Sequence, residues 1–378
     1  MHQPLQLKEI LTARPNYFEL LKIFNISLAL ACILFSKHAN SELSIQQQKS
    51  INEGVKLYNQ ETLSLPLKLG SHTNTDTTLE QNLSKQKGIT LYNQYKATSA
   101  IPFLTTAAEA GDHEAQYYLG EALRKKNHYM NMEAKKWYEA SAGQNDLYAM
   151  IQLGRIEHDM CEISSDCPPS QKQPIEWLNQ AKNIAQERAE AGDAEAMCIM
   201  YEITLDDTWL EKSASAGNAF AQYWMAVSIK QGDGFFLPWK RSEAVEKWFK
   251  LSAEGGYPKS MMEYAAILYE RGDIEGFRNW NEQAALAGYA TTVFGYGSDL
   301  AHEPDTFGYP LDLIKGYALI YWLSELDGGG GMKENVEYTL PRIAAKMTAE
   351  QIEAAKKFSK EWAASHPPLS FFPDKLSR

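Results

Sequence analysis

Small, apolar and aromatic residues recur along the middle of the chain with a fixed internal spacing. Around Gly111, an aromatic residue lies eight positions before the glycine, and two alanines lie four and three before it. An alanine and a leucine follow it at four and eight positions, which gives F-x-x-x-A-A-E-A-G-x-x-x-A-x-x-x-L-G. Residues four or eight apart share one face of an α-helix, so each half of this template predicts an amphipathic helix.

The template recurs in six copies, and we call its central residue the landmark. The landmarks are Gly111, Asn145, Gly192, Gly217, Gly256 and Gly288. Glycine and asparagine tolerate the left-handed conformation that ends a helix, so each landmark is expected to separate two helices. A seventh, degenerate copy begins at Tyr321.

The distances between copies vary although the spacing inside each copy is kept. Successive landmarks lie 25 to 47 residues apart, so insertions fall between helix pairs. One such pair is too small to bury its apolar face, whereas a stack of pairs buries a continuous core. The pattern therefore predicts an all-α array of stacked helix pairs.

The residues of the template resemble the Sel1-like repeat (SLR) family, which is related to the tetratricopeptide repeat. The family pattern runs from an aromatic residue through A-A-E-x-G to A-x-x-x-L-G, and the match covers residues 99 to 329. The resemblance implies a right-handed α-α solenoid of about six Sel1-like helix pairs. Thr348 and Gln351 form a capping-box pattern that opens a further helix, similar to the C-terminal capping helix of many family members.

The chain is expected to have four parts. They are a signal peptide or membrane anchor (1–40), a polar linker with a short helix near 51–58 (41–88), the repeat array (89–329), and C-terminal capping helices with a proline-rich tail (330–378).

The N-terminal part contains the apolar run Ile23 to Phe35. This run would span about 20 Å as a helix, less than the ~30 Å bilayer core, which favours a signal peptide. An uncleaved anchor, a lipidated Cys32 and a buried helix stay open. We expect a periplasmic or envelope-associated protein, or a cytoplasmic one if the segment has no targeting role.

The net charge bears on the choice of partners, and the cysteine positions bear on a possible disulfide. The net charge is −11 and no basic run is present, which argues against nucleic acid and anionic lipid as partners. Membrane contact is expected only through the N-terminal segment. Cys161 and Cys167 flank a short loop that a disulfide could close, although two unrelated thiols would show the same spacing. The spacing is not that of a C-x-x-C metal site.

No catalytic constellation stands out, so we expect neither an enzyme nor a cofactor. Gly328–Gly331 lacks the Lys-Ser/Thr of a phosphate loop, and the histidines show no metal-ligand spacing. Aromatic residues outside the template are candidate partner contacts, or else cover the core near loops. They are Tyr148, Trp224, Phe235, Phe236 and Trp239.

The resemblance implies that the chain is a non-enzymatic scaffold that binds another protein. An exported, acidic, stand-alone array fits an immunity or inhibitor protein of the bacterial envelope that binds a cognate secreted toxin, such as a lipase effector. The alternatives are an adaptor in envelope assembly or signalling, a purely structural envelope element, and a cell-wall hydrolase or β-lactamase-like enzyme.

Overall fold

The computed structural model describes residues 74–156, 159–163, 165, 167–169, 172–234 and 237–376. The N-terminal apolar run and the short helix predicted near 51–58 lie outside these residues. The chain divides into two compact units, 1–48 and 49–378, and every described residue belongs to the second unit. Regular structure in the described part is helical apart from one isolated β-bridge, and none of its helices is long and apolar enough to cross a membrane.

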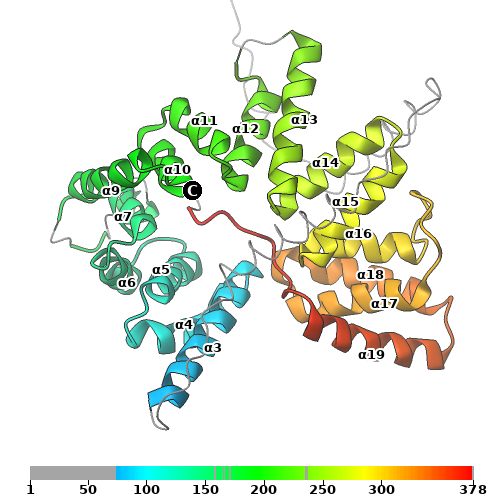
Figure 1. Cartoon of the computed structure of the whole chain (residues 1–378). Helices are drawn as coiled ribbons and strands as arrows, with labels where there is room; N and C mark the ends of the chain where they lie inside the picture. The colour runs from blue at the N-terminus through cyan, green and yellow to red at the C-terminus, as the bar shows by residue number, and fades with distance from the viewer. Residues whose placement is uncertain are drawn as a thin grey trace, which may run out of the picture. The chain divides into compact units, whose positions relative to one another are not determined.

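Six helix pairs follow the six copies of the template (Figure 1). They are α4 (Ala97–Glu109) with α5 (His113–Asn127), α6 (Met132–Ala142) with α7 (Leu147–Gly154), α9 (Pro174–Glu190) with α10 (Ala194–Thr204), α11 (Asp207–Ser215) with α12 (Ala219–Gln231), α13 (Pro238–Glu254) with α14 (Pro258–Glu270), and α15 (Ile274–Leu286) with α16 (Ala290–Leu300). Consecutive helices pack on one another along the array. The predicted all-α array of about six helix pairs is confirmed.

The landmark residues end the first helix of each pair through their backbone conformation. All six have positive φ, from 66° at Asn145 to 96° at Gly192. At the first landmark, the Gly111 amide donates to the Ala108 carbonyl at 3.0 Å, which closes the last turn of α4. A side chain with a Cβ is strained at such a φ, which is why glycine dominates the position.

The residue after the landmark begins the second helix. Asp112 is the N-cap of α5, and its carboxylate accepts a hydrogen bond from the Ala115 amide. Asp146, Asp193 and Asn218 cap α7, α10 and α12 in the same way. The two-residue sequence of landmark and cap thus specifies both the end of one helix and the start of the next.

The helical array begins earlier than the boundary at residue 89. Helix α3 (Asn74–Asn93) packs on α4, so residues 74–88 are helical although the sequence predicted a polar linker there. Gly88 explains the packing, since a Cβ at this position would lie 2.6 Å from Cγ of Leu104. The N-terminal half of α3 is polar and therefore shows no apolar face that would reveal a helix in the sequence.

Helices after the sixth pair close the C-terminal end. They are α17 (Leu313–Trp322), η2 (Leu323–Leu326), η3 (Gly329–Gly331), α18 (Met332–Ala344) and α19 (Ala349–Ser365). The Thr348 hydroxyl and the Gln351 side chain form the predicted capping box at the start of α19. Helix α19 packs on α17, which confirms the predicted capping helix.

Candidate partner-binding site

The segment after α19 runs back across the array to α10 (Figure 1). Its first part, residues 369–372, is here called the strap, and it hydrogen-bonds to the turn between α3 and α4. The Phe371 amide donates to the Asn93 carbonyl at 3.0 Å, and the Gln94 side-chain amide donates to the Leu369 carbonyl at 3.1 Å. The main-chain groups of the strap therefore hold the C-terminal segment to the turn between α3 and α4.

The strap also bonds to the turn between α15 and α16. The Ser370 amide donates to the Gly288 carbonyl at 2.9 Å, and the Ala290 amide donates to the Ser370 carbonyl at 3.0 Å. Together these bonds make a parallel β-bridge between Ser370 and Tyr289. A Cβ at Gly288 would lie 2.6 Å from the Pro368 carbonyl oxygen, so this landmark also allows the segment to approach closely. The strap thus joins the first and last repeats.

The glycine tract at 328–331 has a packing role at the same place. A Cβ at Gly329 would overlap the carbonyl oxygen of Gln94, and one at Gly330 would overlap the ring of Phe371. The tract, whose sequence lacks the features of a phosphate loop, lets η3 approach the strap and the α3–α4 turn.

The residues after the strap, Pro373–Leu376, are here called the tip, and one of them, Lys375, lines a pocket of about 190 Å³. The Lys375 ammonium lies 4.8 Å from the centroid of the Tyr148 ring and 4.0 Å from Oε1 of Glu195. The Tyr117 hydroxyl donates to the Lys375 carbonyl. An ammonium over an aromatic ring and beside a carboxylate is attracted by both groups, so the pocket is suited to a cation.

The repeat itself brings these side chains together. Glu114, Tyr148 and Glu195 each lie three residues after their landmark, in three consecutive copies, and all three line the pocket. The corresponding residue of the fifth copy is Lys259, whose ammonium pairs with the Asp374 carboxylate at 3.2 Å. We call the residues three after each landmark the track. The tip therefore follows one template position across several helix pairs.

Hydrogen bonds orient the pocket side chains. The Tyr148 hydroxyl donates to Oε1 of Glu195 at 2.7 Å. Burial, followed by the charge of Glu195, holds the pKa of the Tyr148 hydroxyl well above its ordinary value, so it acts as a neutral donor. His113 Nδ1 lies 3.3 Å from a carboxylate oxygen of Asp146, and this hydrogen bond raises the pKa of the imidazole.

The structure separates the aromatic residues that the sequence proposed as partner contacts. Tyr148 lies in the pocket, whereas Trp224 packs in a hydrophobic cluster against Phe220 and Tyr223. Trp239 is exposed at the start of α13, and Phe235 and Phe236 lie outside the described residues. The sequence analysis did not single out Tyr117, Glu195 or Lys375. A comparison of the copies position by position would have shown the polar and aromatic track.

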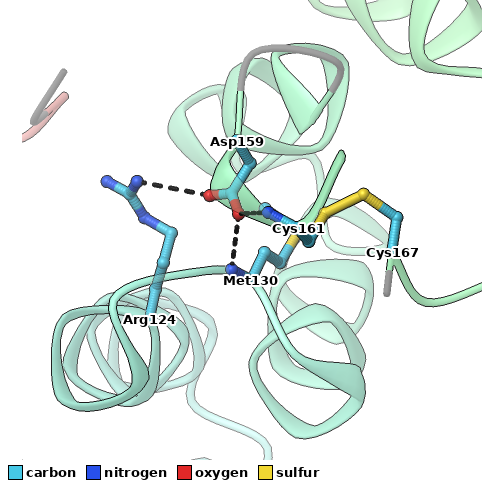
Figure 2. The surroundings of a disulfide bond; sticks show 5 residues. All are labelled: Arg124, Met130, Asp159, Cys161 and Cys167. Carbon is cyan, nitrogen blue, oxygen red and sulfur yellow. Dashed lines mark hydrogen bonds and ion pairs between the residues drawn. A yellow bond between two sulfur atoms is a disulfide. The ribbon is translucent and has the colours of Figure 1, made fainter. Parts of the chain in front are cut away.

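A disulfide holds the long loop between α7 and α9, beside the pocket helices (Figure 2). Cys161, in the short helix α8 (Met160–Ile163), is bonded to Cys167. The carboxylate of Asp159 accepts hydrogen bonds from the Met130 amide at 2.9 Å and the Cys161 amide at 3.1 Å, and it lies 3.6 Å from the Arg124 guanidinium. These contacts tie the loop to α5 and to the α5–α6 turn.

Residue types that bind metals, and one free thiol, occur in the described part of the chain. No group of three or more His, Cys, Asp or Glu residues there could hold a metal ion. Cys198 is a free thiol, and burial, with help from nearby carboxylates, raises its pKa to about 12. A thiol with this pKa is protonated at neutral pH and is a poor nucleophile.

No family model and no curated protein matches the chain. Among solved structures, it is similar to a Sel1 repeat protein from Oxalobacter formigenes, with 18% identity, a TM-score of 0.37, and coverage of 89% of this chain and 98% of that one. It is also similar to a protective antigen with an SLR fold, present in uropathogenic Escherichia coli strains. That match has 15% identity, a TM-score of 0.23, and coverage of 85% and 84%.

The chain's own repeat carries the likeness to Sel1-like repeats. Each of the six template copies folds as a helix pair, and the landmark between its helices has a left-handed backbone conformation. The chain therefore has an all-α fold of stacked helix pairs, and its template resembles that of the Sel1-like repeat.

Proposed function

We propose that the chain is a scaffold that binds another protein, and that the pocket formed by α5, α7 and α10 is its recognition site. One observation carries the proposal: the C-terminal tip already contacts the track and places a lysine between an aromatic ring and a carboxylate. Stacked helix pairs offer an extended binding surface that side chains of successive repeats can adapt to a partner.

The chemistry of the pocket supports binding rather than catalysis. Tyr117 and Tyr148 supply neutral hydroxyl donors, since burial raises the pKa of both well above the ordinary tyrosine value. Glu195 and Glu114 supply negative charge at the rim. The face of the Tyr148 ring and the carboxylates attract a cationic side chain, whereas acyl or glycosyl transfer needs an activated nucleophile or a poised acid and base.

We further propose that the partner is a secreted toxin and that the complex forms in the periplasm or at the envelope. The Cys161–Cys167 disulfide supports this location, because such bonds persist in oxidising compartments. The net charge of −11 suits a basic partner. An adaptor of envelope assembly would use the same pocket, and the partner's identity separates these two roles.

The experiment compares capture of partners by the full chain and two variants. Glu195→Lys reverses the charge in the pocket, and Glu211→Lys makes the same change on the exposed surface of α11. Proteins encoded beside the gene are purified, and their binding is measured by calorimetry. We expect a neighbour-encoded toxin to bind the wild type and Glu211→Lys equally, and Glu195→Lys at least tenfold more weakly, since like charges then meet at the rim.

The two outcomes against the proposal are distinct. Equal binding by all three proteins would place the recognition site elsewhere on the array. Binding of an envelope-assembly protein in place of a toxin, with the same sensitivity to Glu195→Lys, would retain the site and exclude the immunity role.

A further inference from the structure

The strap and the tip of the C-terminal segment are attached in different ways. Strap residues are buried, Leu369 at 1% exposure and Phe371 at 8%, and their main-chain groups bond to both ends of the array. In the tip, the Lys375 side chain is 44% exposed. The tip is held by side-chain contacts and by one main-chain hydrogen bond, from the Tyr117 hydroxyl to the Lys375 carbonyl. The strap is therefore part of the folded core, whereas the tip is suited to detach while the strap stays in place.

Each tip side chain meets a surface of matching chemistry. The Asp374 carboxylate pairs with Lys259 of α14, and the Lys375 ammonium lies between Tyr148 and Glu195. Leu376 packs against the hydrophobic cluster of the first helix pairs. Each of the three consecutive side chains, acidic Asp374, basic Lys375 and apolar Leu376, therefore contacts its own part of the array.

These contacts are individually weak. Ion pairs between partly exposed groups contribute little, and the ammonium of Lys375 is 4.0 Å from the nearest Glu195 oxygen. The tip is held mainly because the strap keeps it close, at an effective concentration in the millimolar range for a short tether. A partner segment that makes the same contacts, and further contacts beyond them, can replace the tip.

We infer that the tip is a built-in occupant of the recognition site, and that a partner displaces it by inserting a lysine of its own extended segment over the Tyr148 ring. This inference rests on the proposed function and specifies the chemistry of the partner: an extended segment with an acidic residue, a lysine and a large apolar residue in succession. Besides Lys375, the pocket is lined by three carboxylates, Glu114, Asp146 and Glu195, and by the basic groups of Arg188 and His113. Glu195, which lies beside the lysine position, disfavours an acidic residue there.

The test uses a fluorescent synthetic peptide, FPDKLSR, which copies residues 372–378. It is titrated by anisotropy into the full-length wild type and into Lys375→Ala, which weakens the tip and leaves the strap intact. Lys357→Ala is the matched control, because it removes one exposed lysine from α19. A second peptide, FPDALSR, lacks the lysine.

We expect Lys375→Ala to bind FPDKLSR about tenfold more tightly than the wild type or Lys357→Ala, because the internal competitor is weakened. We expect FPDALSR to bind Lys375→Ala at least tenfold more weakly than FPDKLSR does. Equal affinity of the three proteins for FPDKLSR, equal affinity of the two peptides, or no binding at millimolar peptide would each overturn the inference.

The inference and the proposed function can fail separately. If a partner no longer binds Glu195→Lys but binds the wild type and Lys375→Ala equally, the proposed recognition site is supported. The inference that the tip occupies that site is then contradicted. Peptide binding as expected, with every captured partner insensitive to Glu195→Lys, would contradict the proposed function instead.

Discussion

Two buried carboxylates, one in the first helix pair and one in the sixth, have opposite surroundings. Glu121 of α5 is fully buried, and its oxygens accept hydrogen bonds from the Tyr92 and Tyr138 hydroxyls, each at 2.9 Å, and from the Gln152 side-chain amide. Asp299 of α16 is 8% exposed, and burial together with the charge of Asp305 raises its pKa to about 7.

The difference shows that neighbours, and not burial alone, decide whether a buried charge stabilises the fold. Hydrogen-bond donors from α3, α6 and α7 converge on Glu121, so this carboxylate links α5 and α7, which carry pocket residues, to α3 and α6. Around Asp299, the environment favours the protonated form. A buried charge is costly unless donors or an opposite charge compensate for it.

The largest effect is expected when the satisfied carboxylate is removed. Glu121→Ala leaves two tyrosine hydroxyls and one amide without their acceptor, so we expect a loss of about 4 kcal/mol in the free energy of unfolding. Urea unfolding followed by circular dichroism measures it. Glu121→Gln keeps an acceptor and should lose less. A loss below about 1 kcal/mol for the alanine variant would show that the network contributes little.

The opposite change is expected at Asp299. Its folded pKa of about 7 is above its unfolded value, so its contribution to stability is complete below pH 4 and is lost as the pH rises through 7. Asp299→Asn should therefore raise the free energy of unfolding by roughly 3 kcal/mol at pH 8 and change it little at pH 4. Urea titrations at both pH values provide the measurement, and an effect independent of pH would contradict the assignment.

The Cys161–Cys167 disulfide is a further feature of the N-terminal half of the array whose contribution to stability can be measured. Replacing both Cys161 and Cys167 by serine opens a loop whose ends are six positions apart, which should cost about 2 kcal/mol. Dithiothreitol should lower the melting temperature of the wild type and leave that of the double variant unchanged. Equal sensitivity of the two proteins to the reductant would mean that the loop is stable without the bond.

The smallest effect is expected at His113, beside the pocket. Its pKa is raised by the hydrogen bond to Asp146, so the interaction is complete below pH 6.5 and is lost at higher pH. The imidazole is more than half exposed, so the contribution should stay below about 0.5 kcal/mol. An NMR titration measures the pKa directly, and Asp146→Asn, which retains a residue able to cap α7, should lower it. An unchanged pKa in that variant would assign the shift to another group.

The sequence predicted the helix pairs because their determinants are local. The landmark at Gly111 and the small residues of its copy lie within a few residues of one another, and their spacing reports both helices and the turn between them. The capping box at Thr348 is equally local. Helix α3 was missed because its polar N-terminal half shows no periodic apolar face. Only Gly88, which packs closely against Leu104, marks its contact with α4.

The candidate site was predicted only in part. Tyr148 was recognised as an aromatic residue outside the template, but its role depends on Lys375, which lies on the last stretch of the chain. A contact between residues so far apart in sequence has no periodic signature. Trp224 carried the same signal as Tyr148, and both side chains are partly buried against hydrophobic clusters, but only Tyr148 lines the pocket.

Local signals were enough to predict the six helix pairs and their turns, since backbone conformation and amphipathic spacing act over a few residues. The path of the strap, the donors around Glu121 and the position of Lys375 at the pocket depend on packing between segments that lie far apart in the sequence. Stacking brings one template position of successive pairs side by side, so that track residues of several pairs together form one surface. That surface exists only once the pairs are packed, because each pair supplies just one part of it.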